Sequence, residues 1–262
     1  LTRWKNILQG LFYFQLARRQ PDFFKTYLVK LVDKALRGQV DVARHFTPRY
    51  NPWDERMCLL PNGDLFKAIR SGKVDVVTDT IDTFTEHGIR LTSGRELEAD
   101  IIVTATGLNV VTLGEVDFTL DGQPIDFGTT WTYKGMGYSD VPNMISTFGY
   151  VNASWTLRAD LNSEYVCRLL TYMKKTGAVK ATPRLRPADR NMTPRLWTEE
   201  FQPGYLKRVL PAMPKQGDRY PWVNTQRYRK DRRLVLRKPV NDGTMEFLTA
   251  AEVARRSTAV PV

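Results

Sequence analysis

Residues 100–107 read DIIVTATG, and this stretch indicates the fold more directly than any other. Four apolar or β-branched residues, 101–104, run into a turn of small residues that ends at Gly107. We expect a short strand of a parallel sheet, buried on both faces, whose end lets a ligand approach the backbone closely. The alternative is an ordinary core strand followed by a turn.

The chain has 262 residues and a formal net charge of +11, with 39 Lys and Arg against 28 Asp and Glu. This length suffices for a sizeable core and one or two domains. The basic excess lies at the two ends, residues 1–50 and residues 181–262. Basic ends can contact anionic lipid or nucleic acid, but a solvated surface is the more common role of such residues.

Cysteines and histidines are few, which limits the chemistry of the chain. Cys58 and Cys167 form no CxxC motif, so neither a redox pair nor a metal site is expected. His45 and His87 are too few for a multi-histidine metal centre within this chain. Reduced cysteines and the lack of an apolar run of about 20 residues favour a cytoplasmic protein. Because the chain begins with Leu1, we interpret it as part of a longer protein.

Residues 1–38 carry apolar side chains at roughly helical spacing, with a break near Pro21 and a stop at Gly38. Two helices are expected. They either pack on a larger body, which is the more common arrangement, or form a basic amphipathic surface that contacts a membrane. The elements expected next are a proline-rich functional loop over 45–64, a helix over 64–69, strands over 74–78 and 81–84, a hairpin turning at 93–94, and a β unit over 116–126.

A strand over 142–149 is expected to lead through residues 152–155, NASW, into a helix over 156–173. This order places free backbone N–H groups and the positive end of a helix dipole at residues 152–156. Such an end can hold electron-rich atoms, including the carbonyl edge of a flavin ring; the alternative is an ordinary capped helix.

The chain beyond residue 181 is rich in Pro and Arg and is expected to be largely irregular. Short helices are possible over 197–210 and 249–256, and residues 234–236 form an apolar, strand-like run within basic residues 227–238. No recognised nucleic-acid motif is present, so no nucleic-acid partner is expected.

Four segments of the chain, 45–84, 88–109, 133–161 and 214–231, together resemble the class B flavoprotein monooxygenases. The nearest subgroup is the Baeyer–Villiger monooxygenases similar to the ethionamide-activating enzyme. The resemblance implies an α/β fold, namely the C-terminal portion of a flavoprotein with two Rossmann-like dinucleotide-binding domains. N-terminal helices and an irregular C-terminal extension would flank this portion.

The resemblance also divides the chain and shows what is missing. The expected parts are a helical segment at 1–44, the end of the NADPH-binding domain at 45–106, the C-terminal part of the FAD-binding domain at 107–180 and a basic extension at 181–262. The family's GxGxxG turns and its FxGxxxHxxxW fingerprint do not occur, and Gly135-Met136-Gly137 does not replace them. We therefore expect a fragment that is inactive alone and does not bind FAD tightly.

FAD and NADPH are the cofactors that the resemblance implies. A C4a-peroxyflavin formed with molecular oxygen would insert one oxygen atom into a small ketone, or oxidise a sulfur or nitrogen centre. Two alternatives stay open: an N-oxygenating flavin monooxygenase that forms no lactones, and a non-catalytic module that uses residues 1–38 at a membrane surface.

This chemistry needs a fixed cation near the oxidising group, and arginine supplies one because it stays protonated. The resemblance points to Arg56 as the catalytic residue, with Arg49 as the alternate and a salt bridge as the competing role. Tyr50 and Trp53 are expected either to line the substrate cavity or to anchor their loop.

The remaining expectations concern cofactor contacts. Thr106 and Gly107 are expected near the junction of flavin and nicotinamide. Residues Asn152, Ala153, Ser154 and Trp155 are expected to approach the flavin ring from the helix end. His45 is expected to be a hydrogen-bonded loop residue rather than a proton shuttle, and Lys134 an exposed lysine rather than a phosphate ligand.

Overall fold

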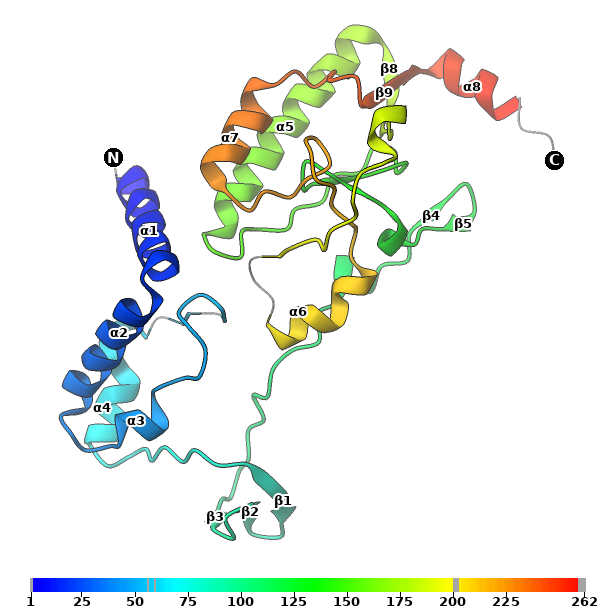
Figure 1. The fold of residues 1–262 in the computed structure, drawn as a ribbon. Coiled ribbons are helices and arrows are strands. Elements are labelled where there is room, and N and C mark those ends of the chain that lie inside the picture. Colours follow the sequence, from blue (N-terminus) through cyan, green and yellow to red (C-terminus); the bar gives the residue numbers. More distant parts are fainter. Residues whose placement is uncertain (1, 56, 59, 200–202, 259–262) are drawn as a thin grey trace. The chain divides into compact units, whose positions relative to one another are not determined.

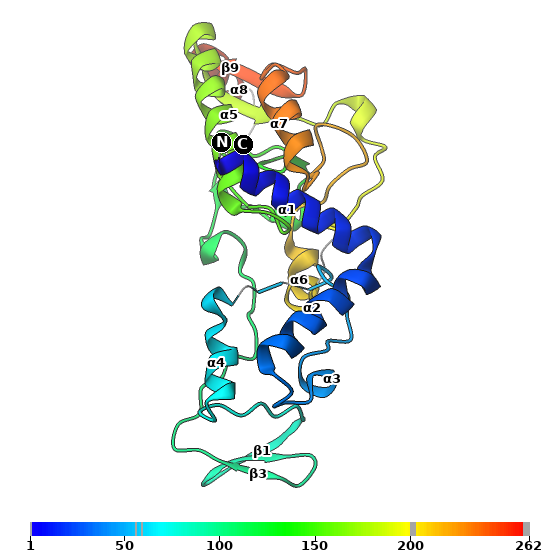
Figure 2. The same cartoon turned by 90° about the vertical axis from the view of Figure 1, so that its left-hand side faces the viewer.

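The computed structural model of the chain describes residues 2–55, 57–58, 60–199 and 203–258, and Figures 1 and 2 show it from two sides. The chain forms two units, Leu1–Leu108 and Asn109–Val262. Arg56 lies outside the described residues. The finer division into four parts stays a prediction.

The first unit begins with a pair of helices, as predicted. Its helices are α1 (Thr2–Arg19), α2 (Pro21–Leu36), α3 (Val42–His45) and α4 (Asp64–Arg70). Pro21 occupies the first turn of α2, where the N–H that it lacks would have no helical partner. A buried cluster of Leu36, Val42 and Ile69 joins α2, α3 and α4. The break near Pro21 and the helix beginning at Asp64 are thus confirmed.

The N-terminal helix pair exposes much apolar surface. Trp4, Leu8 and Phe12 follow one another at four-residue spacing along α1, and all three are exposed. The same spacing relates the exposed residues Phe23, Tyr27 and Leu31 of α2. Across the described part of the chain, no helix combines the length and the apolar character that spanning a membrane requires.

A three-stranded antiparallel sheet follows in the first unit, in the order β1 (Ile81–Thr85), β2 (Gly88–Leu91) and β3 (Glu96–Glu98). The strand predicted near residue 81 and the hairpin after it are confirmed. The strand predicted over 74–78 is wrong, because Val74 and Val76 pack against the helical core instead of pairing in a sheet.

The buried parallel strand predicted over 101–104 is also wrong for this chain. Residues 101–107 belong to no strand, and the side chains of Ile101 and Val103 are 82% and 84% exposed. All the strand pairs of the described residues are antiparallel. A parallel strand buried on both faces needs strands beside it and helices over it, and no described segment takes those places.

The second unit contains one long helix and several shorter elements (Figure 1). Its helices are α5 (Trp155–Thr176), α6 (Gly204–Val209), α7 (Tyr228–Arg237) and α8 (Ala250–Thr258). Its strands pair as β4 (Thr119–Leu120) with β5 (Gln123–Pro124), β6 (Thr132–Tyr133) with β7 (Gly137–Tyr138), and β8 (Ala178–Pro183) with β9 (Met245–Thr249). Among the described residues, short 3-10 helices cover Pro61–Gly63, Thr112–Glu115, Phe127–Thr129, Pro187–Asp189 and Leu210–Ala212. The predicted helix over 156–173 and the β unit over 116–126 are confirmed.

Two predictions for the second unit are wrong. Residues 142–149 form no strand; the N–H groups of Asn143 and Ser146 instead donate to the carbonyls of Ala181 and Met136, at 2.9 and 2.8 Å, in two different segments. The strand-like run at 234–236 is helical and lies within α7, which packs beside α5. The reason is the spacing of its buried residues, Tyr228, Asp231 and Val235, which recur with the period of a helix.

Candidate functional site

The start of α5 is an accessible helix N-terminus. The helix has 22 residues, no acidic residue in its first turn, and an N-cap, Ser154, whose side chain caps no backbone N–H. Ser154 Oγ instead contacts Thr156 Oγ1 at 2.8 Å. Both residues and Trp155 are exposed. Uncapped N–H groups and the positive end of the dipole favour electron-rich atoms at this place.

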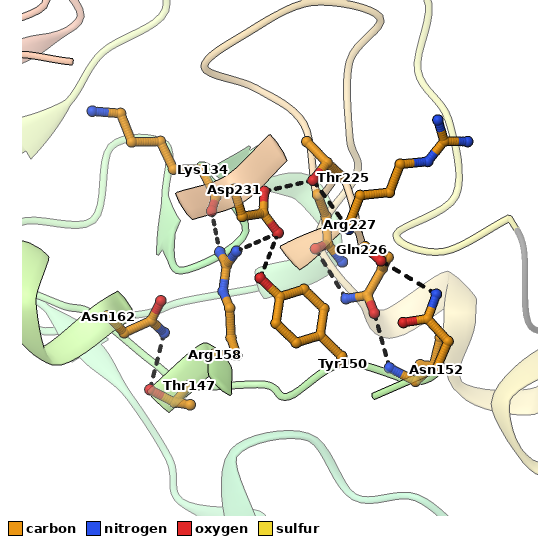
Figure 3. Close-up of polar contacts among 12 residues, drawn as sticks. Lys134, Thr147, Tyr150, Asn152, Arg158, Asn162, Thr225, Gln226, Arg227 and Asp231 are labelled. Atoms are coloured by element: carbon orange, nitrogen blue, oxygen red, sulfur yellow. Dashed lines mark hydrogen bonds and ion pairs between the residues drawn. The ribbon is translucent and has the colours of Figure 1, made fainter. Parts of the chain in front are cut away.

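A buried glutamine holds the segment before α5. Gln226 Oε1 accepts a hydrogen bond from the Val151 N–H at 2.9 Å, and its backbone carbonyl accepts one from Asn152 Nδ2 at 3.3 Å (Figure 3). The Gln226 side-chain amide donates in turn to Asn224 Oδ1 at 3.1 Å. The orientation of Asn152 is therefore set by the residues just before α7.

A buried ion pair lies behind this helix start. Arg158 Nη1 is 3.0 Å from Asp231 Oδ2, and the two side chains are 1% and 5% exposed. Asp231 also accepts hydrogen bonds from the Tyr150 hydroxyl at 2.9 Å and from Thr225 Oγ1 at 2.5 Å (Figure 3). Burial, together with the nearby Asp231 carboxylate, raises the pKa of Tyr150, so the phenol remains a neutral donor.

A second buried cation lies beside the first. Arg158 donates to the backbone carbonyl of Lys134, and Lys134 Nζ pairs with Asp242 Oδ2 at 3.0 Å. The Lys134 ammonium also lies 4.6 and 4.7 Å from the ring centres of Tyr133 and Tyr165. Burial lowers the pKa of Lys134, and Asp242 opposes that shift. The prediction that Lys134 is exposed is wrong, because its partners come from distant parts of the chain.

A cavity of about 320 Å³, here called the aromatic cavity, lies against the start of α5. The residues that line it are Val110, Val111, Thr112, Leu113, Phe127, Thr132, Gly135, Met136, Tyr138, Ser146, Thr147, Phe148, Trp155, Trp197, Met213 and Pro214. The Phe148 ring centre lies 5.0 Å from that of Trp155 and 4.3 Å from that of Trp197, so these rings form a continuous wall. Trp155 is thus both the first residue of α5 and part of this wall.

The aromatic cavity is neutral. None of its described lining residues carries a charge, and the polar groups of these residues are hydroxyls, indole N–H groups and backbone groups. Burial raises the pKa of the one ionisable group, the Tyr138 phenol, which hydrogen-bonds to Ser146 Oγ. Asn162 of α5 supports the same wall by donating to the Ser146 carbonyl at 3.1 Å and to Thr147 Oγ1 at 3.0 Å. The cavity suits a neutral, largely apolar ligand.

The predicted residues of the proline-rich loop lie in the first unit. Tyr50 and Arg49 are exposed, whereas Trp53 packs edge-on against Phe14 of α1 with ring centres 5.5 Å apart. His45 Nδ1 lies 2.8 Å from Thr78 Oγ1, as expected for a hydrogen-bonded loop residue. The role of Arg56, and those of Tyr50 and Trp53 in lining the substrate cavity, stay predictions.

The predicted cofactor contacts fall in both units. Thr106 and Gly107 are exposed at the end of the first unit, and Gly107 has a left-handed φ of 113°. Asn152, Ala153, Ser154 and Trp155 share one helix start in the second unit. The cofactor roles of both groups stay predictions.

Sequence reasoning missed most of the aromatic cavity. Trp197 and Met213 belong to the irregular extension, where no periodic pattern marks a wall. The pairing of Arg158 with Asp231 was not predicted either. The two residues lie in different helices that are far apart in the sequence, and only the fold brings them together. The available signal was the placement of an Arg among the mostly apolar residues that α5 buries.

No protein-family model matches the chain. The FAD-containing monooxygenase EthA of Mycolicibacterium smegmatis is 49% identical over 247 residues, which cover 94% of this chain and 50% of EthA. EthA of Mycobacterium tuberculosis is 50% identical over 246 residues, with the same coverage of 94% and 50%. The probable FAD-binding monooxygenase AlmA of Acinetobacter baylyi is 42% identical and covers 98% of this chain and 51% of AlmA. The chain spans about half the length of the curated relatives that it matches.

The fold is similar to that of OTEMO. The crystal structure of OTEMO in complex with FAD and NADP matches 89% of this chain and 46% of the OTEMO chain, with a TM-score of 0.60 and 20% identity. A second, FAD-bound OTEMO structure matches with a TM-score of 0.55 and 18% identity. The predicted fold class and the family resemblance are thus confirmed. By sequence, the chain is similar to FAD-containing monooxygenases, of which it spans about half.

Proposed function

We propose that the complete protein is an FAD- and NADPH-dependent monooxygenase, and that this chain supplies one wall of its active site. The identity of 49–50% to two FAD-containing monooxygenases over nearly the whole chain supports the reaction class. The NADPH dependence rests on the OTEMO complex with NADP and on the resemblance of the segment ending at Gly107. The proposed reaction transfers one oxygen atom of O2 to a ketone or to a sulfur or nitrogen centre.

The observation that carries the proposal is the double position of Trp155. Trp155 begins α5, whose first turn has no side-chain cap and fits the electron-rich edge of a flavin, and it lines a neutral apolar cavity. A cofactor held at the helix start would therefore lie next to a substrate in the cavity. We assign the flavin contacts to Asn152, Ala153, Ser154 and Trp155, and further cofactor contacts to Thr106 and Gly107.

When bound, FAD supplies the redox chemistry, taking reducing equivalents from NADPH and activating oxygen. The chain's own residues position and shield the substrate. The helix start orients the ring, Gln226 fixes Asn152, and the aromatic wall excludes water from the substrate. We assign to Arg56 the fixed positive charge that stabilises the oxyanion formed on the substrate carbonyl.

A chimera tests the proposal. The chain is joined to the half of M. smegmatis EthA that it does not match, and the chain alone is prepared in parallel. We expect the chimera to be yellow, to oxidise NADPH, and to convert a ketone to an ester, whereas the chain alone should be colourless and inactive. A folded, FAD-loaded chimera that oxygenates no ketone, sulfide or amine would contradict the proposed function. A chain that binds stoichiometric FAD alone would contradict its insufficiency. Formation of only N-oxides from amines would favour the N-oxygenating alternative.

A second, non-catalytic role is supported by the exposed apolar residues of the N-terminal helices. We propose that α1 and α2 can rest on an anionic membrane surface, because exposed aromatic and leucine side chains lie there beside Lys25, Lys30 and Lys34. The chain should bind vesicles that contain anionic lipid more strongly than neutral vesicles. The variant with Leu8→Ser and Phe12→Ser should bind less, and the matched change Gln9→Ser should have little effect. Equal binding by all variants would reject the membrane role.

A further inference from the structure

The aromatic cavity has a neighbour that shares one of its walls. A second cavity of about 260 Å³, here called the side cavity, is lined in part by Leu196, Leu210 and Lys215. Three residues, Trp197, Met213 and Pro214, line both cavities. These shared residues therefore form a partition between the two spaces.

The partition is built from buried side chains on a fixed backbone. Trp197 and Met213 are 4% and 5% exposed and pack in one cluster with Leu210. The carbonyl of Trp197 accepts a hydrogen bond from Asn224 Nδ2 at 3.2 Å, and the N–H of Met213 donates to the Leu210 carbonyl at 3.1 Å. Shortening a partition side chain should therefore open space rather than let the backbone collapse into it.

The backbone beyond Pro214 is also held. The Lys215 N–H donates to the Thr130 carbonyl at 2.9 Å, and the Lys215 carbonyl accepts from the Thr132 N–H at 2.8 Å. Thr132 itself lines the aromatic cavity. The segment that carries Met213 and Pro214 is thus tied directly to another residue of the cavity lining.

We propose that Trp197 and Met213 set the length limit of the substrate. The inference rests on the proposed function, because it takes the aromatic cavity as the substrate site. With the partition closed, the neutral 320 Å³ space takes a short apolar ketone or sulfide. Without the Met213 side chain, the end of a longer apolar chain enters the side cavity. Trp197 and Met213 are specificity-determining residues in this proposal and take no part in the chemistry.

Leu210 provides a matched control. It is buried to nearly the same degree as Met213 and belongs to the same cluster, yet of these two cavities it borders the side cavity and not the aromatic cavity. Met213→Ala and Leu210→Ala remove similar apolar volume from one core, so their effects on stability should be alike. Of these two substitutions, only Met213→Ala removes part of the partition.

The test is calorimetric binding of unbranched methyl ketones of increasing chain length to the full chain. Wild type and Leu210→Ala should share one length above which affinity falls. In Met213→Ala this limit should move to longer ketones, and the longest should bind about tenfold more tightly than to wild type. Trp197→Phe, which keeps a ring against Phe148, should shift the limit in the same direction and serves if Met213→Ala does not fold.

The proposal would be overturned if the chain-length limit stayed unchanged in folded Met213→Ala and Trp197→Phe. It would also be overturned if Leu210→Ala shifted this limit equally, or if no ketone bound to the chain. A shift caused by Phe127→Ala but not by Met213→Ala would also overturn it, since Phe127 lies between the aromatic cavity and a different neighbouring cavity. None of these binding results depends on oxygenation. An active chimera whose chain-length limit does not change in these variants would therefore contradict this inference but not the proposed function.

Discussion

Arg158 Nη1 lies 3.0 Å from Asp231 Oδ2, and this contact joins the first turns of α5 to α7 in the interior of the second unit. Arg158 also reaches the Lys134 carbonyl, in the turn whose next two residues line the aromatic cavity. One guanidinium therefore connects the helix start, the cavity and α7. A full charge is buried here because Tyr150 and Thr225 complete the hydrogen bonding of the carboxylate.

Breaking this pair from one side should be strongly destabilising. We expect Arg158→Met to lower the free energy of unfolding of the second unit by about 3–5 kcal/mol, since Asp231 would remain buried without a cation. Adding Asp231→Asn should restore part of the loss. Arg184→Met is the control, because its bridges to Asp140 and Glu246 are both partly exposed and should each contribute less than about 1 kcal/mol. Urea unfolding followed by near-ultraviolet circular dichroism gives all four values, and equal losses in the two single Arg variants would contradict the argument.

The Arg186–Asp189 contact predicts a pH dependence of stability. Arg186 Nε and Nη2 donate to Asp189 Oδ2 and Oδ1 at 2.6 and 2.9 Å, and this hydrogen-bonded guanidinium holds the pKa of Asp189 below its usual range. A carboxyl whose pKa is lower in the folded state stabilises the fold at pH values above its unfolded pKa, about 3.9. That stabilisation is lost as the pH falls through the folded pKa.

The difference in unfolding free energy between wild type and Asp189→Asn should accordingly be constant near neutral pH and shrink below about pH 4. Arg186→Met should remove the same acid-dependent part, because it removes the donor. Urea titrations at a series of pH values measure both differences. If the difference in unfolding free energy between wild type and either variant grew as the pH fell, the prediction would be contradicted.

Arg56 is predicted to act on the reaction and not on the fold. In the chimera with EthA, Arg56→Lys should keep FAD bound but reduce ketone oxygenation by at least about a hundredfold, since an ammonium lacks the fork of donors that holds an oxyanion. Arg49→Lys is the matched control from the same loop and should retain most of the activity. Wild-type rates in Arg56→Lys would remove its role, and a loss confined to Arg49→Lys would transfer that role to Arg49.

The elements that the sequence predicted correctly are those whose signal is local. The helix pair broken at Pro21, the hairpin after Ile81 and the long α5 each follow from periodicity, proline position or turn residues within one segment. Features decided by distant partners were predicted wrongly. Lys134 is buried because Asp242, far along the chain, neutralises it. The run at Ile101 has the composition of a buried strand, but burial requires neighbouring strands that the described residues do not provide.

Gly149 offers the most direct test of how the helix start and the aromatic cavity are joined. A Cβ at this position would lie 2.0 Å from the Trp155 ring, far inside van der Waals contact. Gly149→Ala must therefore displace the ring or the backbone, and overpacking of this kind typically costs about 1–3 kcal/mol. We expect reduced stability, an altered near-ultraviolet tryptophan signal and weaker binding of ketones in the cavity.

A second substitution separates contact with the ring from general damage to the backbone. In a Trp155→Ala background the indole is gone, so Gly149→Ala should then cost much less than in wild type, and the double-mutant cycle should show a coupling of at least about 1 kcal/mol. Gly10→Ala in α1 is the control, because a Cβ there meets nothing within 4 Å and alanine favours a helix interior. If Gly149→Ala is equally harmful with and without the indole, the glycine serves the backbone and not the packing of Trp155. In that case the cavity wall and the helix start would be held by separate contacts.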